Sequence, residues 1–276
     1  MRHLLHPSAL LAASLLTVSC DLQRAPAEAA PPVIIDLSHT YDDTTVYWPT
    51  AEGFQLRQDS RGWNDRGFYY EANTFTTAEH GGTHLDAPVH FAEGMRSVDE
   101  IPLDQLIGPG VVVDVTEACA ADRDHLVSLD ELLAHEAAHG EIPDGAIVLL
   151  FTGFSRRWPD RASYMGTEVR GAEGVQQLHF PGLHPDAARW LVEERGIGAV
   201  GLDTPSIDHG PSVEFLTHRA LFEANVPAFE NVANLHQLPP RGAEIIALPM
   251  KIRRGSGAPA RIIAVLHGER GPSSDR

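Results

Sequence analysis

The stretch EHGGTHLDAPVHF, residues 79–91, constrains this chain more than any other part of its sequence. It carries three imidazoles and one carboxylate at even offsets, on His80, His84, Asp86 and His90. Residues an even number of positions apart share one face of an extended strand, whereas a helix would turn Asp86 away from the two histidines before it. The glycine pair after His80 also disfavours a helix. The pattern therefore predicts a strand that gathers these polar groups.

Pro88 is unfavourable inside a central strand, so we expect the strand to end near Ala87 and His90 to follow from a loop. Imidazoles and carboxylates are the usual ligands of divalent ions such as zinc and manganese. We expect His80, His84 and Asp86 to hold a metal, which lowers the pKa of a water molecule and makes it nucleophilic. His90 would act beside them as a general acid or base. The alternative is a set of ordinary polar residues in a chain with 15 histidines.

The order His-x-Gly-Thr-His-x-Asp-x-Pro-x-His over residues 80–90 resembles the signature of the cyclase-like metal hydrolases. That family includes bacterial kynurenine formamidase and isatin hydrolase, and the resemblance extends from about Val33 to Leu266. It implies a mixed α/β domain of the swivelling β/β/α type. It also implies hydrolysis of an amide-type C–N bond, in an aryl formamide such as N-formylkynurenine or in a cyclic amide such as isatin, by metal-activated water.

The same resemblance implies a second half of the site. In family members with two metals, a histidine and a glutamate twelve positions apart complete the ligand set, and His218 and Glu230 match that spacing. Asp86 and Glu230 would then bridge two zinc or manganese ions. Relatives such as isatin hydrolase work with one metal and lack this glutamate, so Glu230 favours two ions per chain. The alternative is a helix-capping histidine and a surface acid.

Two further residues are candidates for the substrate pocket. In the family, an aromatic residue near the Trp48–Pro49 step lines the pocket, so the resemblance makes Trp48 a candidate pocket wall; a plain core aromatic is the alternative. His209 follows a family-like loop and is a candidate pocket group. His135 and His139 lie four residues apart on an expected helix, and we interpret them as part of a solvated helix face.

Composition limits the partners of the chain. Its 276 residues carry a net charge of −17, which argues against binding to nucleic acid or to an anionic lipid surface. The charge says little about the small-molecule substrate that we expect, because a bound metal would dominate the local field. One large domain over residues 33–268 fits this length. Two cysteines do not make a disulfide framework. The family resemblance also implies a homo-oligomer.

The N-terminus reads as an export signal. A basic start, an apolar run and Ser19–Cys20 predict a signal peptide of the lipoprotein type over residues 1–20, with Cys20 as a lipid anchor. Cleavage near residues 27–30, which would release a soluble periplasmic protein, is the alternative. Residues 21–32 are rich in Ala and Pro and predict a tether, and residues 269–276 predict a frayed tail.

The remaining chain alternates between expected strands and helices, which predicts an α/β fold with a partly parallel sheet. We expect a capped helix from Ser128 to about Gly140 and another from Pro185 to Gly196. Residues 55–70 fit either a hairpin or a lid. Expected strands cover residues 33–37, 111–115, 146–152, 199–203, 243–249 and 261–266.

Two other classes of function remain open. One is a periplasmic module that binds a metal or a small ligand without turnover, although such a module has no need of a proton shuttle at His90. The other is a lyase or cyclase that uses the same metals to polarise a carbonyl group. Proton abstraction from carbon without incorporation of water would distinguish the latter from a hydrolase.

Overall fold

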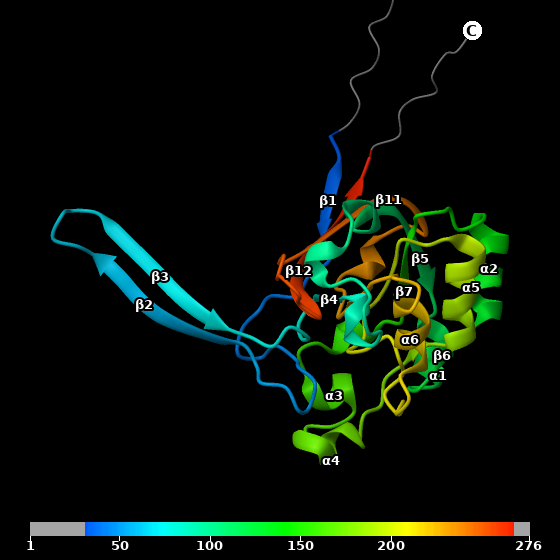
Figure 1. The fold of residues 1–276 in the computed structure, drawn as a ribbon, viewed down its shortest axis with the longest axis horizontal. Coiled ribbons are helices and arrows are strands. Elements are labelled where there is room, and N and C mark those ends of the chain that lie inside the picture. The colour runs from blue at the N-terminus through cyan, green and yellow to red at the C-terminus, as the bar shows by residue number, and fades with distance from the viewer. Residues whose placement is uncertain (1–30, 268–276) are drawn as a thin grey trace, which may run out of the picture. The chain divides into compact units, whose positions relative to one another are not determined.

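In the computed structural model, which describes residues 31–267, β-strands outnumber α-helices. The strands are β1 (Val33–Asp36), β2 (Gln55–Trp63), β3 (Tyr69–Thr76), β4 (His84–Asp86), β5 (Ile107–Asp114), β6 (Leu126–Val127), β7 (Ile147–Phe151), β8 (Gly182–Leu183), β9 (Ala199–Leu202), β10 (Ala228–Glu230), β11 (Arg241–Pro249) and β12 (Gly257–Leu266). The helices are α1 (Thr116–Ala121), α2 (Leu129–His139), α3 (Arg161–Met165), α4 (Gly171–Val175), α5 (Pro185–Arg195) and α6 (Leu216–Phe222). Figure 1 shows their arrangement.

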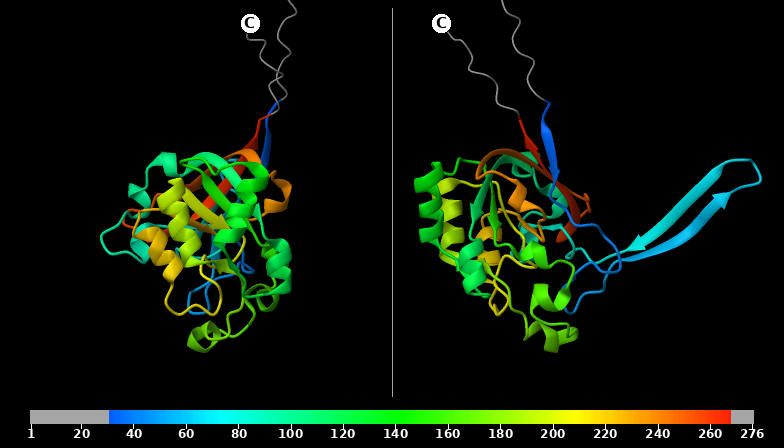
Figure 2. Two further views of the ribbon diagram at one scale, coloured as in Figure 1. Left: turned by 90° about the vertical axis from the view of Figure 1, so that its right-hand side faces the viewer. Right: turned by 180° about the vertical axis from the view of Figure 1, so that it is seen from behind.

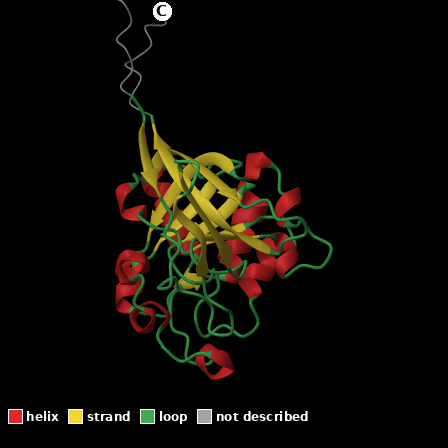
Figure 3. Ribbon diagram, turned by 90° about the vertical axis from the view of Figure 1, so that its left-hand side faces the viewer, coloured by secondary structure: helices red, strands yellow, loops and turns green. Residues whose placement is uncertain are grey.

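Seven strands close into a barrel in the order β12–β11–β5–β7–β9–β10–β4, because β4 pairs with both β10 and β12. The closed set of strands is visible in Figure 3. The pairings β5–β7, β7–β9 and β9–β10 are parallel. The pairings β12–β11, β11–β5, β10–β4 and β4–β12 are antiparallel. Parallel neighbours need crossover connections, which here contain α2, α5 and α6. β1 extends the sheet outside the barrel, antiparallel to β12.

The barrel strands are buried on both faces. In β7, Ile147 and Leu149 belong to a core cluster inside the barrel, while the alternate residues Val148 and Leu150 belong to a second cluster on the outer face. The outer cluster includes side chains of α2 and α5, which cover this side of the barrel in Figure 1. Burial on both faces explains why such strands read as continuous apolar runs in the sequence.

Local signals set the ends of the two long helices. The Ser128 hydroxyl accepts a hydrogen bond from the Glu131 backbone N–H, and the Glu131 carboxylate accepts one from the Ser128 N–H, which makes the predicted capping box. Pro185 occupies the first turn of α5, and Gly196 ends it in the left-handed conformation with φ of 56°. Both predicted helices are confirmed.

The expected mixed α/β single domain is confirmed, while the swivelling β/β/α assignment stays a prediction. Closure of the sheet into a barrel is the feature that the sequence did not suggest. The predicted segments 1–20 and 269–276, and residues 21–30 of the tether, lie outside the described residues. Within residues 31–267, no helix is long and apolar enough to cross a bilayer.

β2 and β3 form a long two-stranded hairpin, residues 55–76, which we call the arm. The arm projects away from the barrel in Figure 1 and in the right-hand view of Figure 2. Its strands pair only with each other among the described strands. The sequence allowed either a hairpin or a lid for residues 55–70, and the structure shows a hairpin that points away from the body.

Candidate metal centre

Strand β4 presents two polar side chains to one side and an apolar side chain to the other. His84 and Asp86 are each 2% exposed and line the same cavity, whereas Leu85 packs in the cluster inside the barrel. β10 and β12 pair with the two edges of β4, so its backbone is held on both sides. The register with β10 puts Glu230 directly opposite His84.

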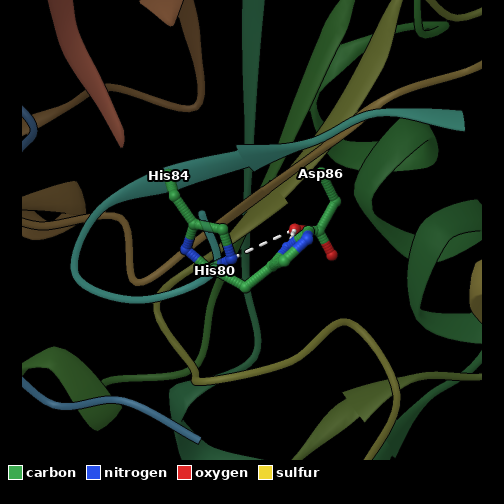
Figure 4. A group of neighbouring side chains, drawn as sticks. All are labelled: His80, His84 and Asp86. Carbon is green, nitrogen blue, oxygen red and sulfur yellow. Dashed lines mark hydrogen bonds and ion pairs between the residues drawn. The ribbon is translucent and has the colours of Figure 1, made fainter. Parts of the chain in front are cut away.

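His80 reaches the same point from outside β4. Gly82 has φ of 58°, and a Cβ on Gly81 would lie 2.0 Å from the Tyr47 ring, so both glycines are needed where the chain turns. After this turn, His80 Nδ1 lies 2.6 Å from Asp86 Oδ1. Figure 4 shows His80 and His84 directed toward the Asp86 carboxylate. The prediction that one strand carries all of these residues was wrong for His80, which precedes β4. The predicted cluster of His80, His84 and Asp86 is nevertheless present.

A second group of ligands shares Asp86. His218 comes from α6 and Glu230 from β10, and His218 Nε2 lies 3.4 Å from both Asp86 Oδ2 and Glu230 Oε1. Asp86 Oδ1 faces the first pair of histidines and Oδ2 faces His218. The structure thus brings together two potential metal-binding groups, made of His80, His84 and Asp86, and of Asp86, His218 and Glu230.

Hydrogen bonds fix the buried histidine rings from their outer side. His84 Nδ1 lies 2.9 Å from the carbonyl oxygen of Gly82, and His218 Nδ1 lies 2.6 Å from Asp208 Oδ2. A ring that donates its Nδ1 proton to such an acceptor keeps a lone pair on Nε2. In both rings, Nε2 is the atom that faces the carboxylates.

His80 uses the opposite pair of ring atoms. Its Nδ1 faces Asp86, and its Nε2 lies 3.0 Å from the Ser256 hydroxyl. Ser256 in turn donates to Glu79 Oε2 at 2.7 Å. Glu79 and Ser256 therefore orient the His80 ring from behind, as acceptors commonly do for metal-binding histidines.

The buried carboxylates require a compensating positive charge. Burial raises the pKa of Glu230, and the nearby charge of Asp86 raises it further. Burial alone would lower the pKa of His84, but Asp86 and Glu230 outweigh it and raise that pKa to about 9. The pKa of His218 is raised well above its usual value, because hydrogen bonds to carboxylates outweigh its burial. Protonated imidazoles or a bound cation can supply this charge.

The residues fit a divalent cation. His84 Nε2 is buried and makes no hydrogen bond within the described part of the chain, although Asp86 Oδ1 is 3.0 Å away and Glu230 Oε2 is 3.4 Å away. An unpaired buried nitrogen among carboxylates is costly unless another group binds it. Imidazole nitrogens and carboxylate oxygens are the donors that zinc and manganese accept.

A cavity of about 310 Å³ lies over these groups. Trp48 lines it and also packs against Phe180, with ring centroids 6.4 Å apart, so it serves as both pocket wall and core aromatic. His209 is not among the lining residues. The apolar and aromatic part of the lining consists of Val46, Tyr47, Trp48, Ala51, Ala78, Phe91, Pro205 and Phe215.

His90 lines the same cavity and differs electrostatically from the other histidines. Its ring stacks on His80 with centroids 3.9 Å apart, and its centroid is 6.3 Å from that of His218. Burial lowers the pKa of His90 to about 4, and the opposing charge of Asp86 does not restore it. His90 is therefore a neutral imidazole at pH 7, able to accept a proton at the edge of the ligand groups.

The sequence and fold match one family of known proteins. The family model named Cyclase matches residues 35–209, more than half of the chain. The chain belongs to the cyclase family. Isatin hydrolase of Roseibium aggregatum is 34% identical over 208 residues, covering 72% of this chain and 76% of that protein. Kynurenine formamidase of Salinibacter ruber is 29% identical over 235 residues, covering 83% of this chain and 96% of that protein.

A solved structure extends the similarity to the fold. Isatin hydrolase A from Ralstonia solanacearum is 33% identical and superposes with a TM-score of 0.77, covering 85% of this chain and 92% of that one. The resemblance inferred from the motif is thus confirmed. The chain is a cyclase-family metal-dependent hydrolase related to isatin hydrolase and kynurenine formamidase.

The cyclase-family match ends before His218 and Glu230, so the second ligand group rests on its geometry in this chain. Sequence reasoning missed several residues around the site. Asp208, which holds His218, sits next to the predicted His209, and its offset of ten residues from His218 gives no periodic signal. Ser256 lies in a glycine turn that reads only as a connection between strands.

Proposed function

We propose that this cyclase-family protein hydrolyses an amide-type C–N bond in a small aromatic compound. One observation carries the proposal. Two ligand groups that share Asp86 form the floor of a small cavity whose walls are largely aromatic and apolar. Such walls favour a flat apolar substrate, and the polar floor orients its reacting group. Trp48 and Phe215 are the lining residues that we expect to contact its ring.

A divalent cation held by these groups would lower the pKa of a water molecule and polarise the substrate carbonyl. The chain supplies the remaining chemistry. His90 accepts the proton of the attacking water at its free ring nitrogen and delivers it to the leaving nitrogen. Asp208 holds His218 in the tautomer whose Nε2 can bind the cation, and Phe91 shields that ring, with centroids 4.5 Å apart. We assign no role in the reaction to His209.

We infer that the cation is zinc or manganese and that each chain holds two. His80, His84 and Asp86 would bind the first ion, and Asp86, His218 and Glu230 would bind the second. The division of Asp86 between the two groups, one oxygen to each, supports a bridging role. Glu230 lies within 3.4 Å of both His84 and His218 and supports the same arrangement.

Isatin and N-formylkynurenine are the leading substrates, because the relatives named above are an isatin hydrolase and kynurenine formamidases. We propose that the protein is exported through the signal at residues 1–20 and acts in the periplasm, either anchored by lipid at Cys20 or released by cleavage near residues 27–30. An exported enzyme favours an external cyclic amide such as isatin over N-formylkynurenine, whose breakdown is expected in the cytoplasm.

The test measures bound metal and turnover on the same preparation. The protein would be loaded with zinc or with manganese, its metal counted by mass spectrometry of the elements, and both substrates assayed. Cleavage that depends on the metal, with one oxygen from labelled water in the product, supports the hydrolase. Turnover without that oxygen indicates a lyase or cyclase, and bound metal without turnover of either compound discards both substrates.

Two variants separate binding from proton transfer. His84→Ala is expected to lose metal and turnover together, since it removes a ligand. His90→Ala is expected to retain its metal content and lose about 100-fold or more in kcat, the usual contribution of general acid–base catalysis. If His90→Ala instead empties the site, His90 is a ligand and the proposed division of roles is wrong.

A further inference from the structure

One continuous segment, residues 46–51, supplies much of the lining of the cavity, and we call it the wall segment. Five of its six residues line the cavity, and the segment lies outside the helices and strands. At its start, the Gly82 N–H donates to the Val46 carbonyl oxygen at 3.1 Å, and Tyr47 forms a single antiparallel bridge with Gly81. The rest of the segment has no strand partner, so its position depends on contacts with other parts of the chain.

Two arginines hold the backbone of the wall segment. Arg161, at the start of α3, donates from Nη1 to the Tyr47 carbonyl oxygen at 2.7 Å. Arg170 donates from Nη2 to the carbonyl oxygen of Ala51, at the other end of the segment. Neither arginine is among the described residues that line the cavity. Both can therefore affect a bound substrate only through the wall segment.

Helix α4 packs on the middle of the wall segment, between the two arginine contacts. The Gly171 N–H donates to the Pro49 carbonyl oxygen at 2.9 Å. A Cβ atom on Gly174 would lie 3.1 Å from Pro49 Cβ, so α4 approaches the segment closely. In Figure 1, α3 and α4 lie together below the barrel, and the blue loop that contains the wall segment lies beside α3. The held carbonyl groups are those of residues 47, 49 and 51, every second residue of the segment.

The guanidinium group of Arg161 is a costly group for a contact that only fills space. Its Nε and Nη2 are buried and have no hydrogen-bond partner between residues 31 and 267. Burial lowers the pKa of Arg161, and the charge of Arg170 lowers it further. An apolar side chain in the same place would avoid the loss of hydration. What the arginine adds is a rigid planar donor that fixes the Tyr47 carbonyl group.

The position of the wall segment determines where the Trp48 ring stands. Trp48 lies between Tyr47 and Pro49, whose carbonyl groups are both held, and its ring meets Phe180 edge-on while lining the cavity. A flat aromatic substrate gains much of its affinity from such ring contacts. The potential metal ligands come from other segments of the chain. Release of the wall segment should therefore weaken binding of an aromatic ring and leave metal binding intact.

We propose that Arg161 and Arg170 are positioning residues that set the affinity of the cavity for the aromatic ring of its substrate, by holding the wall segment and with it Trp48. The inference rests on the aromatic substrate class proposed above, and it names residues outside the cavity that select this class.

The test measures binding without turnover, on the full chain incubated with zinc. The probe is indole, a flat neutral aromatic compound that has no amide bond to cleave. Arg161→Met and Arg170→Met keep a long side chain and remove the donor. Each is expected to weaken indole binding about tenfold in a calorimetric titration, the effect of one lost hydrogen bond, with bound zinc unchanged. Arg241→Met is the matched control, because it removes an arginine that donates to the His139 carbonyl oxygen at 2.9 Å, and it should bind indole like the wild type.

A double-mutant cycle shows whether the arginines act through Trp48. In a Trp48→Ala protein, Arg161→Met should cause no further loss of indole affinity, because the ring that it positions is absent. Arg170→Lys retains a charged donor and should bind indole almost as tightly as the wild type. If Arg161→Met does not fold, Arg170→Met in the Trp48→Ala protein gives the same comparison. A full tenfold loss in the Trp48→Ala protein would overturn the proposal, as would unchanged affinity in both methionine variants or a loss of zinc together with indole.

Kinetics separate positioning from a part in the reaction. With isatin as substrate, the two methionine variants are expected to raise KM about tenfold and to keep kcat, since they remove binding that is equal in the ground state and the transition state. A fall in kcat with unchanged KM would overturn the proposal. A wild type that binds indole and cleaves neither proposed substrate, with weaker binding in the arginine variants, would support the positioning role and refute only the reaction. A wild type that does not bind indole would overturn the positioning role.

Discussion

The cavity floor and the arm differ in how far their side chains find partners within the described chain. At the floor, the ring nitrogens of His80, His84 and His218 each face an oxygen of a carboxylate, a carbonyl or a hydroxyl, and His84 Nε2 makes no hydrogen bond within the described part of the chain. On the arm, apolar rings and backbone edges face outward along both strands. The ligand groups of the floor converge on a space of a few ångströms, whereas the exposed surface of the arm extends along two whole strands. The contrast shows that polar groups gathered at one buried point differ physically from apolar side chains spread over an exposed hairpin.

Loss of a shared ligand should give the largest effect. Asp86→Asn removes one charge from both ligand groups, so we expect loss of bound metal and a fall in kcat/KM of about 1,000-fold or more, given several kcal/mol per ion. Asp65→Asn removes the same charge from the exposed tip of the arm and should change neither quantity. Equal metal content in the two variants would contradict the ligand assignment.

The same change of leucine to alanine should separate the two regions by stability. Leu85 is fully buried inside the barrel, so Leu85→Ala should lower the free energy of unfolding by about 2–5 kcal/mol. Leu56→Ala on the arm should lower it by about 0.5 kcal/mol or less within one chain. Urea unfolding at low protein concentration measures both. A large loss for Leu56→Ala there would mean that the arm packs on its own body.

The hydrogen bond behind His218 should matter less than the ligands. Asp208→Asn leaves the ring without its charged acceptor, and such changes weaken metal binding by about 10–100-fold. A competition titration with a chelator measures the affinity. Asp59→Asn on the arm, another aspartate that accepts side-chain hydrogen bonds, is the control and should leave the affinity unchanged. Unchanged affinity in Asp208→Asn would show that His218 needs no orienting group.

The smallest effect concerns pH, and it belongs to the body, since the arm contains no histidine. Burial lowers the pKa of His39 to about 4, and the charge of Asp36 opposes the shift. The His39 ring stacks on Trp158, and its Nε2 has no hydrogen-bond partner among residues 31–267. A lowered folded-state pKa contributes stability that is complete above the unfolded value of about 6.5 and is lost as pH falls toward 4. Between pH 7 and 5, we expect a loss of about 1–2 kcal/mol, reduced from the full shift for partial exposure.

His39→Phe should flatten this pH dependence, because phenylalanine keeps the stacking and cannot be protonated. Unfolding by urea at the two pH values gives the comparison. His236→Phe replaces an exposed histidine and should keep the wild-type slope. A His39→Phe variant whose stability still falls as steeply would attribute the pH dependence to other groups.

The ligand residues were predictable because their chemistry is concentrated in a short motif. His80, His84 and Asp86 are close in sequence, and only imidazole and carboxylate groups serve the expected cation. His218 and Glu230 were accessible through family resemblance alone, since nothing local in the sequence links them to the first group. Capping signals likewise fixed the two long helices to within a residue or two.

The parts that escaped prediction depend on contacts between distant segments. β4 has only three residues, too few for any periodic pattern, yet its second edge pairs with β12 and closes the barrel. The turn at Gly81 and Gly82 brings these residues so close to Tyr47 and Tyr41, respectively, that a Cβ atom at either position would clash with the ring. Such close approaches are set by tertiary packing, which overrides local preference. Asp208 was missed for the same reason.

Closure of the barrel by β4 also dictates when the protein can acquire its metal. The ligands of β4 meet Glu230 only after β10 has paired with them, and the other edge of β4 waits for β12 near the end of the chain. Strands that are so distant in sequence pair late in folding, because closing the long loop between them costs conformational entropy before their contacts form. A growing or unfolded chain therefore has no complete site. If the site holds a divalent cation as proposed, the cation binds only after the chain has folded, so the metals available where folding ends contribute, together with the ligand set, to which one is bound.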